Sequence, residues 1–288
     1  MARIIRGTSK NARFIAVDSK DIVQKALDLH KATPKAIEAF GKLMTAGLMM
    51  GTDLKGDDLL TLRTDTDGPL NHMVVTTDAK SGIKGYMSNP AADLQSNGVS
   101  AITGKGILRV IKDMGLKEPY VGMSDIKNGD LAHDLAYYYY TSEQTPSVVA
   151  LGVSLNQDMT VKAAGGYMIQ LLPGAQDSFI DALEEKVKAV RNVTELFEGG
   201  MDLERIIKLL YEDMTDENHE KLVEEFEILE ETHVDYQCNC EREKFFKGLI
   251  TLGKEQLKEI FTEKEELEVE CHFCKKKYSF KENEFFKI

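Results

Sequence analysis

Cysteine is scarce in this sequence, and long apolar runs are missing. Only four cysteines occur in 288 residues, and all of them lie at or after position 238. No stretch approaches about 18 uninterrupted apolar residues, so no segment is suited to span a bilayer as an apolar helix. Residues 1–14 carry four basic side chains but no apolar run of about seven residues, which excludes a secretory signal peptide. We therefore expect a soluble, cytoplasmic protein with no membrane partner.

Positive charge is also in short supply. The formal net charge is −12, which argues against nucleic acid as the partner because phosphate contacts require clustered Lys and Arg. The imbalance is local: residues 178–234 carry 17 acidic and six basic side chains, whereas residues 1–177 carry 19 of each and residues 235–288 carry 12 acidic and 11 basic ones. The charge distribution therefore divides the chain into a core zone (1–177), an acidic zone (178–234) and a C-terminal zone (235–288).

The core zone mixes strand-like and helix-like patterns, which predicts an α+β domain. Short β-like runs, most of them bounded by Gly, Asp or Asn, predict strands. These runs are residues 59–63, 73–77, 107–111, 148–153 and 167–171. A helix is predicted over residues 34–50, where Thr33 can cap the first turn and apolar residues recur every three or four positions. A second helix is predicted over residues 129–140.

The acidic zone has the pattern of a helical linker. Apolar spacing predicts one helix over residues 178–198 and a second one from residue 203. A third helix is predicted from Leu222, Val223, Phe226 and Leu229. Short helices need a packing partner, and the remaining faces of these are crowded with like charge. We therefore predict a metastable linker; the alternative is an ordinary solvated helical linker.

The four cysteines form two pairs, Cys238 with Cys240 and Cys271 with Cys274, separated by 30 residues. In a reducing compartment such a cluster indicates a metal, catalytic or redox-sensing site rather than structural disulfides. Four thiolates complete the tetrahedral shell of zinc, which is typical of a structural site. The second pair has the usual two-residue spacing, but the single residue inside the first pair and the long gap are unusual. The pattern predicts one Zn²⁺ ion per chain, held by all four cysteines.

Two features beside the cysteines allow other interpretations. His272 lies inside the second pair and could ligate, but four cysteines already complete the shell, so we predict an exposed side chain. The basic run from Lys275 to Lys277, next to Tyr278, could indicate nucleic acid. Because the zone is close to neutral, the preferred interpretation is that these cations lie near thiolates whose four negative charges exceed the two positive charges of the ion.

Beyond the cysteines, motifs are spread over the whole sequence. They are GTDLKG (51–56), DGPL (67–70), EPY (118–120), SEQTPS (142–147), AGGY (164–167) with LPGA (172–175), and LGKEQL (252–257). In this order they resemble the heat shock protein 33 family, the redox-regulated 33 kDa chaperonins of bacteria. The resemblance implies a core domain (1–177), a metastable helical linker (178–234) and a small zinc-binding redox-switch domain (235–288), which coincide with the three charge zones.

The resemblance implies a redox-regulated, ATP-independent holdase chaperone and not an enzyme. Its partners would be unfolded or oxidatively damaged client proteins, and its active form a homodimer. By the same resemblance, the four cysteines ligate zinc when reduced. When oxidised, they form disulfides, zinc leaves and the linker unfolds. The family often has Ser and a basic residue after the first pair, whereas this chain has Glu241 there, so the resemblance does not set the oxidant threshold.

The pairing of the oxidised cysteines is not fixed by their number, since four cysteines allow three pairings. Within the mechanism that the resemblance implies, we predict Cys238–Cys240 and Cys271–Cys274. These partners stay close after the metal leaves, whereas crossed partners separate when the domain unfolds. Two other classes of function stay open from the residues alone: a constitutive zinc-stabilised interaction module, and an enzyme in the α+β core. Redox-dependent zinc release tests the first, and a turnover assay on the core tests the second.

Overall fold

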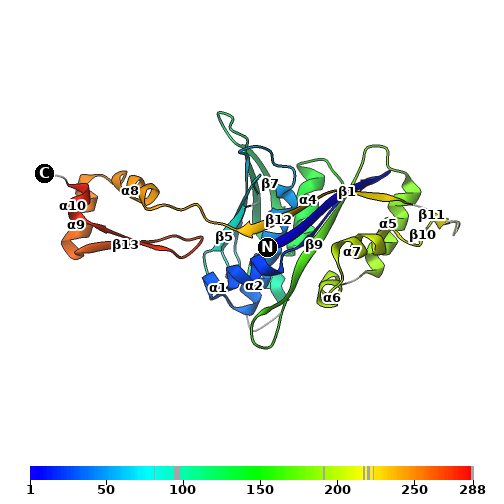
Figure 1. Cartoon of the computed structure of the whole chain (residues 1–288), viewed down its shortest axis with the longest axis horizontal. Helices are drawn as coiled ribbons and strands as arrows, with labels where there is room; N and C mark the ends of the chain where they lie inside the picture. Colours follow the sequence, from blue (N-terminus) through cyan, green and yellow to red (C-terminus); the bar gives the residue numbers. More distant parts are fainter. Residues whose placement is uncertain are drawn as a thin grey trace. The chain divides into compact units, whose positions relative to one another are not determined.

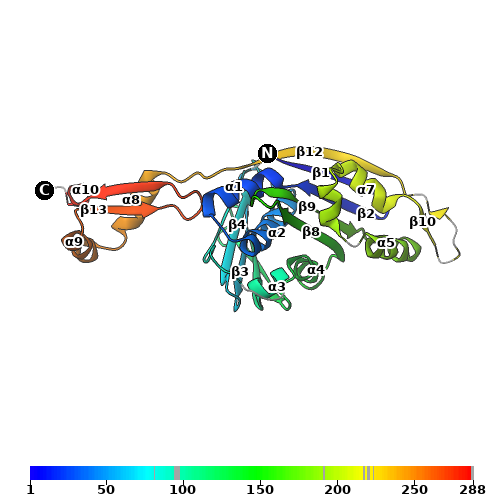
Figure 2. The same ribbon diagram turned by 90° about the horizontal axis from the view of Figure 1, so that it is seen from below.

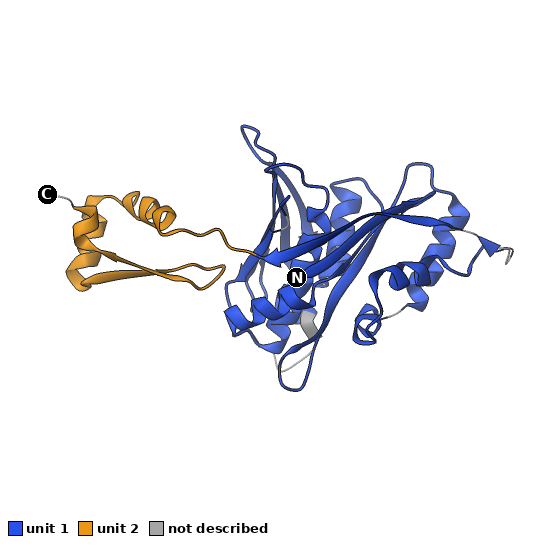
Figure 3. Cartoon of the chain, viewed as in Figure 1, with its two compact units in different colours: residues 1–236 blue, residues 237–288 orange. Residues whose placement is uncertain are grey.

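The computed structural model describes residues 1–80, 82–93, 98–190, 192–216, 218, 221–222 and 224–286. The chain forms two compact units, residues 1–236 and 237–288 (Figure 3). The first unit thus contains both the core zone and the acidic zone. The functional division into core, linker and switch domain concerns how these parts behave on oxidation, and it stays a prediction.

Ten described strands of the first unit form one sheet in the order β7, β6, β3, β4, β5, β12, β1, β2, β9, β8 (Figure 1). All neighbours pair antiparallel except β5 and β12, which pair in parallel through Asp235 with Gly82 and Tyr236 with Ile83. This short junction joins two five-stranded halves. The strands are β1 (Ala2–Ser9), β2 (Ala12–Asp18), β3 (Leu59–Thr66), β4 (His72–Asp78), β5 (Gly82–Met87), β6 (Gly106–Asp113), β7 (Tyr120–Ile126), β8 (Ser147–Leu155), β9 (Val161–Leu171) and β12 (Phe226–Tyr236).

Helix α2 (Pro34–Gly51) is the centre of the main core. Thr33 caps it by accepting a hydrogen bond from the backbone N–H of Ala36 at 3.4 Å, and Pro34 occupies its first turn. The helix contacts strands of both halves of the sheet, and α1 (Lys20–His30), α3 (Gly98–Thr103) and α4 (Leu131–Thr141) complete this layer (Figure 2). The α+β prediction is confirmed.

The strands β1, β2 and β9 are buried on both faces. Their residues alternate between the main core and a second cluster on the opposite face, so that Ile4 belongs to the first and Ile5 to the second. The helices α5 (Asp177–Ala189), α6 (Val193–Glu198) and α7 (Leu203–Tyr211) cover this opposite face. The second cluster includes Ile5, Phe14, Tyr167 and Ile169 from the strands and Phe179, Leu183, Ile206, Ile207, Leu210 and Tyr211 from the helices. The apolar faces of the acidic zone are therefore covered by the sheet of their own unit.

Most predicted elements of the core zone are confirmed. All five predicted strands are present, as β3, β4, β6, β8 and β9, and the helix over residues 34–50 is α2. Helix α4 begins two residues later than predicted because Asp130 caps it, accepting from the N–H of Ala132 at 3.3 Å. The prediction missed β1, β2, β5, β7, α1 and α3.

Two predictions in the acidic zone are wrong. The single helix over residues 178–198 is interrupted, because Asn192 caps a new helix, α6, through the N–H of Thr194 at 3.1 Å. The third helix, predicted from Leu222, does not exist among the described residues, and Val223 lies outside them. The described residues of this region instead form two short paired strands, β10 (Met214–Thr215) and β11 (Lys221–Leu222), and then β12.

Strand β12 forms because β1 offers it a full set of backbone partners. The two strands pair antiparallel from Ala2 with Val234 to Ser9 with Phe226, with one bulge after Arg6. Cross-strand ion pairs reinforce the register: Arg3 Nε donates to Glu231 at 2.8 Å, and Arg6 Nε donates to Glu230 at 2.5 Å. The guanidinium of Arg3 also pairs with Glu204 of α7. Arg3 therefore contacts both β12 and α7 of the acidic zone.

The second unit is small and rich in polar surface. It contains α8 (Arg242–Ile250), α9 (Lys254–Glu263), the hairpin β13 (Glu266–Glu270) and β14 (Lys277–Lys281), and α10 (Glu282–Phe285). The hairpin pairs antiparallel from Glu266 with Lys281 to Glu270 with Lys277. In the described ranges, no helix of the chain combines the length and apolarity needed to cross a membrane.

Candidate metal centre

The first cysteine pair lies on an extended segment. Cys238 and Cys240 precede α8 and follow the end of β12 at Tyr236. The ammonium of Lys244, in the first turn of α8, donates a hydrogen bond to the carbonyl of Asn239 at 2.9 Å. This contact fixes the residue between the two cysteines, so that both thiols can point to the same side.

The second cysteine pair lies in the turn that joins β13 to β14. The N–H of Cys271 donates to the carbonyl of Lys276 and the N–H of Lys275 donates to the carbonyl of Cys271, both at 2.9 Å. Lys275 adopts a left-handed conformation (φ 61°), which closes the turn. Cys271 is buried and Cys274 is half-buried. The hairpin thus presents two thiols in a fixed backbone geometry.

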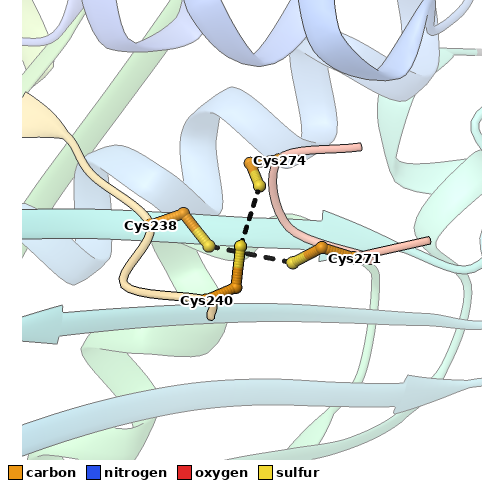
Figure 4. Close-up of side chains that lie close together, drawn as sticks. All are labelled: Cys238, Cys240, Cys271 and Cys274. Atoms are coloured by element: carbon orange, nitrogen blue, oxygen red, sulfur yellow. Dashed lines mark hydrogen bonds between the residues drawn. The ribbon is translucent and has the colours of Figure 1, made fainter. Parts of the chain in front are cut away.

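The fold brings all four predicted cysteines together, as Figure 4 shows. Their Sγ atoms lie within 4.8 Å of one another, and the cluster includes close approaches between cysteines of different pairs. Cys238 and Cys271 are 3.8 Å apart, and Cys240 and Cys274 are 3.4 Å apart. Four sulfur atoms around one point, with no other side chain of the described residues in the cluster, could hold a metal ion.

Tyr278 lies directly against this cluster. Its hydroxyl is 3.3 Å from the Sγ atom of Cys240 and donates a hydrogen bond to the carbonyl oxygen of the same residue at 3.0 Å. The ring is buried and packs on Phe245 with a centroid distance of 5.0 Å. Tyr278 comes from β14, so it connects the hairpin with the first cysteine pair.

The environment gives the thiols different acidities. Burial raises the pKa of Cys238 to about 12 and also raises the pKa of Cys274. Burial opposes ionisation of Cys240 as well, but hydrogen bonds from Tyr278 and the other cysteines outweigh it and lower the pKa of Cys240 to about 7. Cys240 therefore ionises more readily than Cys238 or Cys274.

Aromatic rings and one arginine hold the rest of the unit around the site. Phe280 is fully buried, and its ring neighbours those of Phe246 and Phe285 at centroid distances of 6.2 and 6.1 Å. The guanidinium of Arg242 lies 4.4 Å from the Phe280 centroid and donates to the carbonyl of Ser279 at 2.7 Å. A core of so few residues gives little stability by itself, so a bound metal would add much to the fold of this unit.

The residues next to the cysteines have the following places. His272 is exposed, as predicted, and does not belong to the sulfur cluster. Lys275 and Lys277 pair with Glu270 and Glu268 of β13 at 3.2 and 2.8 Å, and Lys276 lies over the ring of Tyr278. Lys275 and Lys277 therefore stabilise the hairpin through ion pairs. The contact of Tyr278 with the sulfur cluster was not predicted from the sequence, in which Tyr278 is only a neighbour of the basic run.

Known proteins resemble this chain over its whole length. The model of the family described as Hsp33 protein matches residues 3–281. The 33 kDa chaperonin of Clostridium botulinum is 40% identical over 291 residues, which cover 98% of this chain and 95% of that protein. The 33 kDa chaperonin of Lachnoclostridium phytofermentans is 41% identical over 287 residues, covering 96% and 94%. The crystal structure of the 33 kDa chaperonin (heat shock protein 33 homolog) of Thermotoga maritima matches with a TM-score of 0.87 and 28% identity, covering 98% of this chain and 96% of that one.

The relatives that match over the whole length place this chain among the chaperonin-type proteins, and its small unit carries a candidate metal centre. The chain belongs to the Hsp33 family. The resemblance stated from the sequence motifs is therefore confirmed. The relatives are named as chaperonins and not as enzymes, in agreement with the sequence prediction.

Proposed function

We propose that this protein is a redox-regulated, ATP-independent holdase chaperone, inactive when reduced and metal-bound. Oxidation converts its four cysteines to two disulfides, releases zinc and frees apolar surface that holds unfolding proteins. The observation that carries the proposal is the convergence of all four cysteines of the chain in one small unit that follows the acidic zone directly. Family membership supports the chaperone part.

The geometry of the sulfur cluster fits zinc. With a Zn–S distance of about 2.3 Å, the edges of a tetrahedron are about 3.8 Å long. Here Cys238 Sγ lies 3.8 Å from Cys271 Sγ, and Cys240 Sγ lies 3.4 Å from Cys274 Sγ. Thiolates are soft ligands that suit Zn²⁺ better than Mg²⁺ or Ca²⁺. Cys238, Cys240, Cys271 and Cys274 would hold the ion, which when bound would keep the thiolates deprotonated and join the extended segment to the hairpin turn.

The oxidation step needs a two-electron oxidant such as a peroxide. A cysteine thiolate donates an electron pair to one peroxide oxygen, the O–O bond breaks, and a sulfenic acid forms. The neighbouring thiolate then attacks this sulfur and displaces hydroxide. Each disulfide thus consumes one peroxide, which is reduced to two waters with two protons. Neither sulfur of a disulfide remains a good metal ligand, so two disulfides remove the whole ligand set.

We propose that the disulfides join Cys238 to Cys240 and Cys271 to Cys274. In the folded site the Sγ atoms of the crossed pairs are only 3.8 Å (Cys238 and Cys271) and 3.4 Å (Cys240 and Cys274) apart, so the folded geometry alone does not select the neighbour pairs. A crossed disulfide would close a loop of more than 30 residues and stabilise the unit by about 3–4 kcal/mol in the chain-entropy model. Neighbour disulfides close almost no loop, so they let the unit unfold, as activation requires.

The acidic zone can transmit this unfolding to the rest of the first unit. Strand β12 ends at Tyr236, immediately before the second unit, and its other end carries Phe226, which packs on the second cluster. Loss of β12 would remove the strand partner of β1 and the carboxylate Glu231 that Arg3 holds. The excess of negative charge in the zone then favours its separation from the sheet. The second cluster would become exposed, as a surface for client proteins.

Three further parts of the proposal rest on the family resemblance and on the free thiols. The functional boundaries are 1–177 for the core, 178–234 for the linker and 235–288 for the switch domain. The active form is a homodimer, which light scattering of the oxidised protein tests. The compartment is the cytoplasm, because a switch that starts from four reduced cysteines requires a reducing environment.

The proposed function is tested by measuring zinc release and client protection on the same samples. Zinc release after peroxide addition is followed with a chromogenic chelator, and suppression of the aggregation of a thermally unfolding client is followed by light scattering. We expect both to rise together and to reverse on reduction with zinc resupplied. Client protection by the reduced protein, equal to that after oxidation, would favour a constitutive interaction module instead.

A further inference from the structure

The position of Tyr278 is fixed by its surroundings and not by the cysteines alone. Its backbone pairs with Val269 in the β13–β14 hairpin, its ring packs on Phe245, and its residue is only 8% exposed. The hydroxyl therefore reaches Cys240 from a rigid support. Because Tyr278 belongs to the hairpin that carries Cys271 and Cys274, this contact links the two cysteine pairs through the protein.

The hydroxyl has one proton and two acceptors within reach. The carbonyl oxygen of Cys240 accepts it at 3.0 Å, and the Sγ atom of the same residue lies at 3.3 Å, inside the range for a hydrogen bond to sulfur. A neutral thiol is a weak acceptor, whereas a thiolate accepts a stronger, charge-assisted hydrogen bond. The phenol can turn from the carbonyl to the sulfur when Cys240 carries negative charge, as it does as a metal ligand.

We propose that Tyr278 is a positioning residue that slows oxidation at Cys240; this inference rests on the proposed function. Its hydrogen bond withdraws electron density from the Cys240 lone pair, which must attack the peroxide oxygen. It also keeps the sulfur directed toward the other three cysteines. Groups that hydrogen-bond to a metal ligand commonly tune the site in this way. Tyr278 would thus help to set the oxidant concentration at which the switch responds.

The test uses the full-length protein and Tyr278→Phe, which removes the hydroxyl and keeps the ring against Phe245. Tyr120→Phe, on an exposed tyrosine of the first unit, is the matched control. Circular dichroism and one zinc per chain establish that both variants fold. Under a fixed peroxide concentration, zinc release is timed, and a sulfenic-acid probe with peptide mapping measures labelling at Cys240 and at Cys271. We expect release from Tyr278→Phe to be about three- to tenfold faster, as for loss of one hydrogen bond, and the ratio of Cys240 to Cys271 labelling to rise by a similar factor.

The labelling ratio separates positioning from loosening of the fold. Equal acceleration at both cysteines would mean that Tyr278 only stabilises the unit, and unchanged or slower labelling of Cys240 would equally overturn the inference. If zinc stays bound to the wild-type protein under peroxide, the proposed function fails. The labelling ratio of the two proteins still decides the role of Tyr278 in that case, because it does not depend on metal release.

Discussion

The attachment of the acidic zone can be tested with one substitution in α7. Leu210 belongs to the second cluster and is 0% exposed, whereas Leu229 of β12 lies in the same zone and is 61% exposed. Leu210→Ala and Leu229→Ala therefore remove the same atoms from a buried and from an exposed position. A buried Leu→Ala change costs about 2–5 kcal/mol, while a surface change stays within about 0.5 kcal/mol.

Hydrogen exchange of the reduced, metal-loaded protein measures locally how much stability each substitution removes. If α5, α6 and α7 open as a unit, about 2–5 kcal/mol raises the opening equilibrium of residues 203–211 by about 30-fold to about 4,000-fold in Leu210→Ala. Leu229→Ala should change it less than about threefold. Strand β9 should keep its protection in both variants, because its other face belongs to the main core.

The same variant has an expected functional consequence. Opening of the acidic zone without oxidation exposes the second cluster, so reduced Leu210→Ala should suppress client aggregation in part, whereas reduced Leu229→Ala should not. Equal exchange in residues 203–211 of the two variants would refute the attachment of the acidic zone through Leu210. Loss of protection in β9 together with α7 would refute it as well, because the acidic zone would then not be a separable unit.

Three further predictions concern the ion pairs and the cysteines. Arg3→Gln should increase exchange in α7 and β12 only a few-fold at pH 7, because its partners are partly exposed. The hydrogen bond from Arg3 lowers the pKa of Glu231 below its ordinary 4.5, so the wild-type contact is fully present above pH 4.5 and is lost as pH falls below it; a pH series of exchange should show this loss in the wild type and not in Arg3→Gln. Cys271→Ser should abolish tight binding of zinc, and full occupancy measured by metal analysis would contradict the ligand set. Peptide mapping of the zinc-free, active protein should find only disulfides between neighbouring cysteines, and a crossed pair in that fraction would show that the unit stays closed.

The sequence alone determined the parts of this protein whose signal is local. Helix α2 was predictable because Thr33, Pro34 and the three- and four-residue apolar spacing act within a few turns. Most of the five predicted strands are bounded by turn residues. The clustering of the four cysteines was also predictable, because four soft ligands in a chain with no other cysteine have few alternative uses.

Strand β12 shows where local reasoning failed. The apolar residues from Leu222 to Leu229 have helical spacing, yet Phe226 and Leu229 lie in strand β12, where Leu229 is 61% exposed. Its conformation is decided by β1, more than 200 residues away in the sequence, which supplies the backbone partners and the cations Arg3 and Arg6. Strands β1 and β2 were missed for a related reason: both of their faces are buried, so they lack the alternation of a half-buried strand.

Only the tertiary structure placed the acidic helices and Tyr278. The amphipathic pattern of α7 shows that one face must be covered, but it cannot say whether the sheet or another surface covers it; the alternation of Ile4 and Ile5 between two clusters decides this in favour of the sheet. Tyr278 and Cys240 are 38 residues apart, and no spacing rule predicts their contact. It arises because the antiparallel pairing of β13 with β14 and the packing on α8 bring the phenol to the sulfur, which is a property of the folded unit and not of any segment.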